Sequence, residues 1–178
     1  LPTWTVLECI RRIPHRMLVY NSIDALGENP AGVSRDYDTA EMEILKQADL
    51  VLTTSEALYK DKVSHNSHTY WVPSGVDSSW FETAIPAAEV VDLPSPRIGF
   101  FGAIDHRFDQ DLVRAMAQKH RNWTFILIGI VRCEVSDLLR EENIHFLGSK
   151  PHSDLVRYVS ALDVLFLPYV IDGFTRHI

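Results

Sequence analysis

The chain has 178 residues, of which 46% are hydrophobic and 23% are charged, a balance typical of a soluble globular protein with one ordinary domain or two small ones. Its formal net charge of −7 disfavours nucleic-acid binding, because Lys and Arg must neutralise the phosphate backbone in such complexes. Cys9 and Cys133 are too few and too far apart for a disulfide framework or a zinc knuckle, so both are expected to be reduced thiols. No run approaches the roughly 18 apolar residues of a membrane helix, and the first residues lack the pattern of a secretory signal.

Apolar runs alternate with helical patterns from residue 17 onward. Thr53 and Glu56 have the spacing of a capping box, which predicts a helix through Lys60. Pro73, Ser74 and Gly75 mark a turn. In chain order, the pattern predicts a strand at 17–20, a helix at 36–48, and strands at 50–53 and 69–72.

Residues 83–96 contain three prolines and no sustained periodicity, which predicts a linker between two domains, 1–82 and 97–178. The alternation then restarts. Strands are predicted at 97–101, 123–128, 144–147 and 164–168. Helices are predicted to begin at the caps Asp109 and Ser153, and a short helix is predicted at 136–141. These strands are apolar on both faces, which is typical of parallel strands covered by helices on both sides.

Ligands of open parallel sheets bind beyond the carboxyl ends of the strands. After the first strand of the second half come Gly102, Ala103, Asp105 and Arg107. The glycine allows close approach of a ligand to the backbone, the helix that starts at Asp109 offers N–H groups to a phosphate, and Arg107 adds a charge-assisted contact. The alternative is a plain strand-to-helix turn. The segment is no G-x-G-x-x-G fingerprint, which disfavours a nicotinamide dehydrogenase.

The later strands end in further candidates. Gly129 follows the second strand, Lys150 and Pro151 follow the third, and Asp172 follows the fourth. Lys150 is expected to meet a phosphate or the edge of a base, unless it is a solvated loop lysine. Asp172 is expected to bind sugar hydroxyls or to cap a turn.

In the first half, Asn21, Asp24, Ser74 and Gly75 are candidates for a cleft between the halves, although each also suits a strand end or a turn. No set of three or four metal ligands converges, and the sequence holds neither a P-loop nor a H-E-x-x-H or G-x-S-x-G motif.

Several segments together resemble a known family. Residues 18–24 are similar to its Y-D-x-x-D strand, with Asn21 where Asp is usual, and residues 72–77 to its V-P-N-G-V-D signature, with Ser74 where Asn is usual. The remaining segments, in the right order, are 41–55, 80–81, 98–105, 144–148, 150–151 and 161–168. The family is that of the GT-B glycosyltransferases, in particular the family-4-like (group 1) bacterial enzymes.

The resemblance implies an α/β chain with two Rossmann-like parallel-sheet domains, both incomplete. Residues 1–82 would be the later part of an N-terminal acceptor-side domain, 83–96 the linker, and 97–178 the front part of a C-terminal nucleotide-sugar donor domain. The family's first strands would precede Leu1, and its E-x7-E segment would follow Ile178. The chain alone is therefore expected to be inactive.

The resemblance also implies a reaction, the transfer of a sugar from a nucleoside diphosphate sugar to a glycan or lipid-linked acceptor in surface polysaccharide synthesis. No metal and no other cofactor is expected, and the catalytic base is unassigned. The location would be cytoplasmic, with peripheral attachment at the inner face of the membrane left open. A sugar-nucleotide epimerase of the same fold and a non-catalytic nucleotide-sugar-binding protein remain alternatives. The implied donor-binding residues are Gly102, Ala103, Asp105, Arg107, Gly129, Lys150, Pro151 and Asp172, and the acceptor-side residues are Asn21, Asp24, Ser74 and Gly75.

Overall fold

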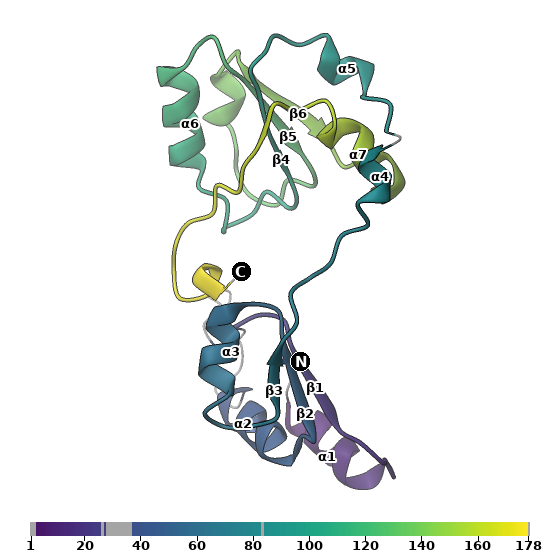
Figure 1. Cartoon of the computed structure of the whole chain (residues 1–178). Coiled ribbons are helices and arrows are strands. Elements are labelled where there is room, and N and C mark those ends of the chain that lie inside the picture. The colour runs from purple at the N-terminus through teal and green to yellow at the C-terminus, as the bar shows by residue number, and fades with distance from the viewer. Residues whose placement is uncertain (1–2, 26, 28–36, 83, 178) are drawn as a thin grey trace. The chain divides into compact units, whose positions relative to one another are not determined.

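A computed structural model describes residues 3–25, 27, 37–82 and 84–177. The chain divides into two compact units (Figure 1). Unit 1 comprises Leu1–Gly75 with Ile171–Ile178, and unit 2 comprises Val76–Val170. Each unit contains one parallel sheet with its helices, which confirms the predicted α/β fold class.

Unit 1 is built on a three-stranded parallel sheet in the order β1-β2-β3. Its helices include α1, which the sequence pattern did not predict; Thr3 caps this helix, because its side chain accepts a hydrogen bond from the Val6 N–H at 3.3 Å. The elements are α1 (Trp4–Arg12), β1 (Val19–Ser22), α2 (Tyr37–Gln47), β2 (Leu50–Thr53), α3 (Glu56–Lys62), β3 (Thr69–Trp71) and the 3-10 helix η3 (Thr175–His177).

The core of unit 1 lies where α2 meets α1 and the sheet. Ala40 and Ile44 of α2 pack with Leu7 of α1, and Leu45 packs with Val51 of β2. These α2 positions recur at the spacing of one helix face, and the helix predicted at 36–48 is confirmed.

Unit 2 is built on a four-stranded parallel sheet in the order β6-β5-β4-β7. The expected strands all form, although β7 is shorter than predicted, and the helix expected at 136–141 is a single 3-10 turn. The elements are α4 (Ser79–Glu82), α5 (Ala88–Val91), β4 (Arg97–Phe101), α6 (Gln110–Lys119), β5 (Thr124–Ile128), η2 (Leu138–Arg140), β6 (Ile144–Gly148), α7 (His152–Val159) and β7 (Val164–Leu165).

Both faces of the unit 2 sheet are covered, and the fully buried central strand β5 shows how. Phe125 and Leu127 join a cluster with Val113 of α6, whereas the alternate residues Ile126 and Ile128 join a second cluster on α5 and α7. Successive side chains of a strand point to opposite faces, so helices lie on both sides, as the apolar strands predicted (Figure 1).

The units differ from the predicted domains at both boundaries. The expected linker, 83–96, contains α5 and belongs to unit 2, because Ala87 and Val90 are buried against β5 and the Ala87 N–H donates to the Arg157 carbonyl at 2.9 Å. The last residues, Ile171–Ile178, group with unit 1, where η3 contacts α3. Prolines marked irregular backbone correctly, but they did not reveal that the segment buries apolar side chains.

Two predicted helix caps are wrong and one is confirmed. Thr53 is a buried strand residue whose hydroxyl donates to the Tyr70 carbonyl, and Ser55 instead caps α3 by accepting from the Leu58 N–H at 3.3 Å. Helix α7 starts one residue before Ser153, directly after Pro151, whose fixed φ suits a helix entrance. Asp109 caps α6 as expected.

Candidate functional site

Three glycines follow one another across the carboxyl edge of the unit 2 sheet. Gly102 comes directly after β4, Gly129 directly after β5, and Gly148 ends β6. Their φ angles are +149°, +149° and +67°, in the region that residues with a Cβ rarely adopt. The Gly102 N–H donates to the Ile128 carbonyl and the Gly129 N–H to the Gly148 carbonyl, both at 2.9 Å. This glycine strip, Gly102, Gly129 and Gly148, therefore exposes backbone where other residues would project side chains.

The loop that follows Gly102 is hydrogen-bonded to neighbours on both sides. Toward β5, the Ile104 N–H donates to the Ile130 carbonyl at 2.9 Å. Toward β7, the Asp109 N–H donates to the Pro168 carbonyl at 2.7 Å. The Ile104 side chain is fully buried beneath the loop. The loop is thus fixed in place before any ligand arrives.

Arg107 is held within this loop by Asp105 and lies over an aromatic ring. The Asp105 carboxylate accepts hydrogen bonds from Arg107 Nε at 3.0 Å and Nη2 at 2.7 Å. The Arg107 guanidinium carbon is 5.8 Å from the centroid of the Tyr169 ring. Hydrogen bonds from Arg107 hold the pKa of Asp105 below its usual range although burial opposes this shift, so Asp105 is a carboxylate at neutral pH.

The first turn of α6, where the sequence pattern predicted a phosphate site, already carries negatively charged side chains. The Asp109 side chain accepts from the Leu112 N–H at 2.9 Å, and Asp111 adds a second carboxylate in the first turn. Among the described residues, none accepts a hydrogen bond from the Ala103 N–H. The Ala103 N–H and the Arg107 side chain are therefore two donors of this loop that suit an anion.

Lys150, at the carboxyl end of β6, is not the solvated lysine that was one reading of the sequence. Its Nζ lies 3.0 Å from Glu89 Oε1 and 4.7 Å from the centroid of the Tyr158 ring, and the Tyr158 hydroxyl donates to the same Glu89 oxygen at 2.6 Å. Bonds with Tyr158 and Glu89 raise the pKa of Lys150. Sequence reasoning missed Glu89 and Tyr158, since no local motif links residues 61 positions apart.

Asp172 was predicted to bind the donor in the second domain, but it lies in unit 1. Its carboxylate accepts from the Phe174 N–H at 2.9 Å and the Thr175 N–H at 2.8 Å. This is the turn cap that the sequence offered as the alternative. Pro151, another predicted donor contact, is exposed at the N-cap position of α7.

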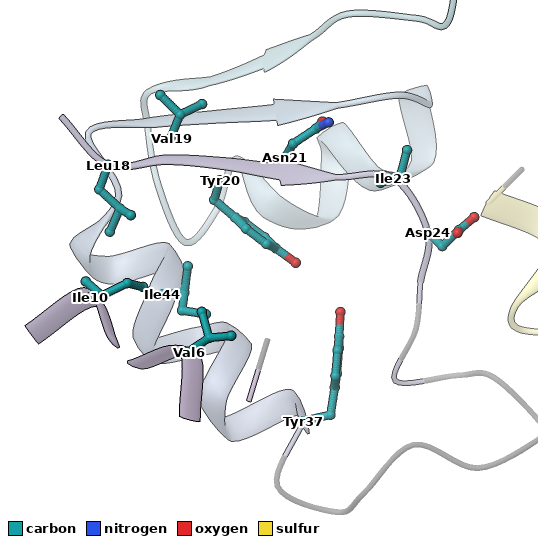
Figure 2. Close-up of a pocket in the computed structure, with 10 residues that line it drawn as sticks. All are labelled: Val6, Ile10, Leu18, Val19, Tyr20, Asn21, Ile23, Asp24, Tyr37 and Ile44. Atoms are coloured by element: carbon teal, nitrogen blue, oxygen red, sulfur yellow. The ribbon is translucent and has the colours of Figure 1, made fainter. Parts of the chain in front are cut away.

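Unit 1 contains a pocket of about 570 Å³ that Asn21 and Asp24 help to line (Figure 2). The other lining residues, from α1, α2, β1 and the residues flanking β1, are apolar except for Tyr20 and Tyr37, whose hydroxyls point toward one another in Figure 2. Ser74 and Gly75, the other two predicted acceptor-side residues, are exposed and are not among the lining residues of this pocket. The structure thus brings together half of the predicted acceptor-side set.

A buried polar network lies behind this pocket. The Tyr20 hydroxyl donates to Glu41 Oε1 at 2.6 Å, and Lys62 Nζ donates to Glu41 Oε2 at 2.9 Å. The Tyr37 hydroxyl is buried with no partner among the described residues. Burial, and then the charge of Glu41, raise the pKa of Tyr37 to about 12. Burial and Glu41 also raise the pKa of Tyr20, so both tyrosines are neutral at physiological pH. Sequence reasoning named neither of them as a site residue.

Two negative findings apply to the described part of the chain. No group of three or more His, Cys, Asp or Glu side chains is arranged to hold a metal ion. No helix in these residues has the length and apolar character to cross a membrane.

Comparison with known proteins gives relatives in sequence and in fold. No family model matches the chain. It is 26% identical over 142 residues to TuaH of Bacillus subtilis (strain 168), named as a teichuronic acid biosynthesis glycosyltransferase, a match that covers 74% of the chain and 36% of TuaH. HepE of Anabaena, solved in complex with UDP, superposes with a TM-score of 0.67 at 20% identity, over 90% of the chain and 48% of HepE. Sucrose-phosphate synthase from Thermosynechococcus elongatus gives 0.67 at 23% identity, over 91% and 46%.

The chain spans about half the length of these solved relatives and about a third of TuaH. The structural likeness covers nearly the whole chain, including both parallel sheets. In sequence and in fold, this chain is therefore similar to the glycosyltransferases of the GT-B class.

Proposed function

We propose that the chain is part of a glycosyltransferase that transfers a sugar from a nucleoside diphosphate sugar, and that the donor binds at the carboxyl edge of the unit 2 sheet. The observation that carries the proposal is the glycine strip beside Arg107. Phosphates bind where the backbone is accessible and N–H groups and a guanidinium converge, and this edge supplies the Ala103 N–H and the Arg107 side chain on one fixed loop.

In this reaction the edge needs only to stabilise negative charge. When the bond from the sugar to the diphosphate breaks, negative charge grows on the departing diphosphate. Donors that are already in place stabilise that charge without having to reorganise. The loop after β4 meets this requirement, because it is bonded to its neighbours on both sides. UDP is the first nucleotide to test, since HepE was solved with UDP and with UDP-glucose.

The acceptor belongs to the same proposal. A glycan or lipid-linked acceptor of surface polysaccharide synthesis agrees with the name of TuaH. Asn21 and Asp24, which are among the lining residues of the unit 1 pocket, would bind its hydroxyls. A lipid-linked acceptor would place the enzyme in the cytoplasm at the inner face of the membrane.

The test is thermal unfolding of the 178-residue chain with UDP, GDP, ADP, dTDP and NAD in turn. A ligand present at ~100 times its dissociation constant stabilises the protein that binds it by about 2.7 kcal/mol. We expect a selective rise in unfolding temperature with one nucleoside diphosphate, and a smaller rise in the Arg107→Gln variant. A rise with NAD alone, or with none of the five, would overturn the proposal.

A further inference from the structure

We infer that Asp105 is a positioning residue for the donor diphosphate, and that it acts by fixing the Arg107 guanidinium against the Tyr169 ring. The inference rests on the proposed function, because it concerns the same edge of unit 2. It assigns Asp105 a role through Arg107, in place of the direct donor contact that the sequence suggested.

Asp105 is built to orient a guanidinium. Its side chain is nearly buried, with 12% of it exposed, whereas that of Arg107 is 28% exposed. Oδ1 accepts from both the backbone N–H and Nε of Arg107 at 3.0 Å, and Oδ2 accepts from Nη2 at 2.7 Å. The two bonds from Nε and Nη2 fix the plane of the guanidinium, and the bond from the backbone N–H fixes the Asp105 carboxylate itself.

Tyr169 provides the second surface, and the backbone holds it in place. The Val170 N–H, next to Tyr169, donates to the Arg107 carbonyl at 2.8 Å, and Phe108 pairs with Tyr169 in an antiparallel bridge. The Tyr169 ring also meets the buried Phe100 ring edge-on, with centroids 6.0 Å apart. The Arg107 guanidinium carbon therefore lies 5.8 Å from the centroid of a Tyr169 ring whose position is fixed by these contacts.

Such an arrangement lowers the entropy that Arg107 would lose on meeting a phosphate. A free arginine side chain gives up rotamer freedom when it binds, whereas one already held in its bound orientation gives up less. The negative charge of Asp105 has the opposite effect, since it screens Arg107 from a phosphate. The two roles predict opposite effects of removing the carboxylate. If Asp105 positions Arg107, diphosphate binding becomes weaker. If Asp105 only neutralises the charge of Arg107, diphosphate binding becomes tighter.

The experiment is calorimetric titration of UDP and of uridine into the wild-type chain, Asp105→Asn and Asp111→Asn. Asp111→Asn is the matched control, because it removes one carboxylate from the neighbouring first turn of α6, where the Asp111 side chain is 91% exposed and pairs with Arg114. We expect Asp105→Asn to weaken UDP about tenfold, the effect of losing about 1.4 kcal/mol, and Asp111→Asn to leave UDP unchanged. Uridine, which has no phosphate, should bind the wild type and Asp105→Asn equally.

Three results would contradict the inference. If Asp105→Asn binds UDP as tightly as Asp111→Asn, or more tightly, Asp105 has no positioning role, although the donor site remains in place. A parallel loss of uridine and UDP affinity would mean that Asp105 maintains the fold and does not act on the diphosphate, which also contradicts the inference. If the wild-type chain binds no nucleoside diphosphate, the proposed function fails first. Should Asp105→Asn not fold, Asp105→Glu keeps the carboxylate one methylene farther out, and we expect it to weaken UDP but not uridine.

Discussion

The α-carbon of Gly129 faces the carbonyl oxygen of Gly102 so closely that a Cβ at position 129 would lie 1.8 Å from that oxygen. With its φ of +149°, Gly129 is also in a conformation that other residues rarely adopt. Gly129→Ala must therefore move backbone in the glycine strip. We expect it to destabilise unit 2 by at least about 2 kcal/mol, from backbone strain together with the clash, measured by urea unfolding.

Gly75→Ala is the control for that substitution. No atom lies within 4 Å of a Cβ built at position 75, and Gly75 is not among the described glycines with positive φ. Its alanine variant should unfold within about 0.5 kcal/mol of the wild type. Equal stability of the two variants would show that the glycine strip is not packed as described.

Tyr20 and Tyr37 differ in what their hydroxyls do, although both line the unit 1 pocket. Tyr20→Phe leaves a nearly buried Glu41 oxygen without its donor and should cost about 1–3 kcal/mol. Tyr37→Phe removes a buried hydroxyl that has no partner among the described residues, so it should be neutral or stabilising. Urea unfolding followed by tryptophan fluorescence distinguishes the two, and a larger loss for Tyr37→Phe would contradict this network.

The Lys62–Glu41 ion pair is buried, with 10% and 9% of the two side chains exposed. Burial lowers the pKa of Lys62, but its bonds to Glu41 and Asp61 outweigh burial and raise it, so the lysine is charged. Lys62→Met leaves a buried carboxylate unpaired and should cost about 3–5 kcal/mol. The double variant Glu41→Gln with Lys62→Met should recover part of that loss in a double-mutant cycle; strictly additive losses would mean that the pair is not coupled.

The pair of Asp105 and Arg107 predicts a pH dependence. Because Arg107 lowers the pKa of Asp105 in the folded state, the pair stabilises unit 2 fully above the unfolded pKa of about 3.9. That contribution is lost as the pH falls through the lower, folded value. The difference in unfolding free energy between wild type and Asp105→Asn should therefore be larger at pH 7 than at pH 3, as measured by urea unfolding. A difference that stays constant would show that folding leaves the pKa of Asp105 unchanged, so that Arg107 adds no charge-dependent stability.

The central strand β5 of unit 2 could be predicted because burial on two faces leaves a mark in the sequence. Phe125 through Ile128 are all apolar, and all are buried, with α6 on one face of β5 and α5 and α7 on the other. Helix α2 was likewise predictable from the helical spacing of Ala40 and Ile44. Helix α1, which Thr3 caps in the structure, was missed, because its nine residues carry few inward positions and Leu7 is the one that is fully buried.

The site was predicted only in part, for a physical reason. The glycine strip and Arg107 lie at strand ends, which topology alone identifies. Asp105, the charged partner of Arg107, is local in sequence. Tyr169, which lies under Arg107, and Glu89, which pairs with Lys150, are brought there by the fold and not by neighbouring sequence. Local pattern identifies the edge at which we propose that the donor binds, whereas the pairing of charges depends on packing between distant segments.

The most direct test of the central claim is to titrate UDP into the isotope-labelled chain and follow its backbone amides by NMR. Binding at the carboxyl edge of unit 2 predicts that the largest shift changes fall on Gly102, Ala103, Arg107, Gly129 and Gly148, with the unit 1 amides of Asn21 and Asp24 unchanged. Saturable shift changes confined to unit 1, or to residues such as Asn143 that precede the strands of unit 2, would contradict the account.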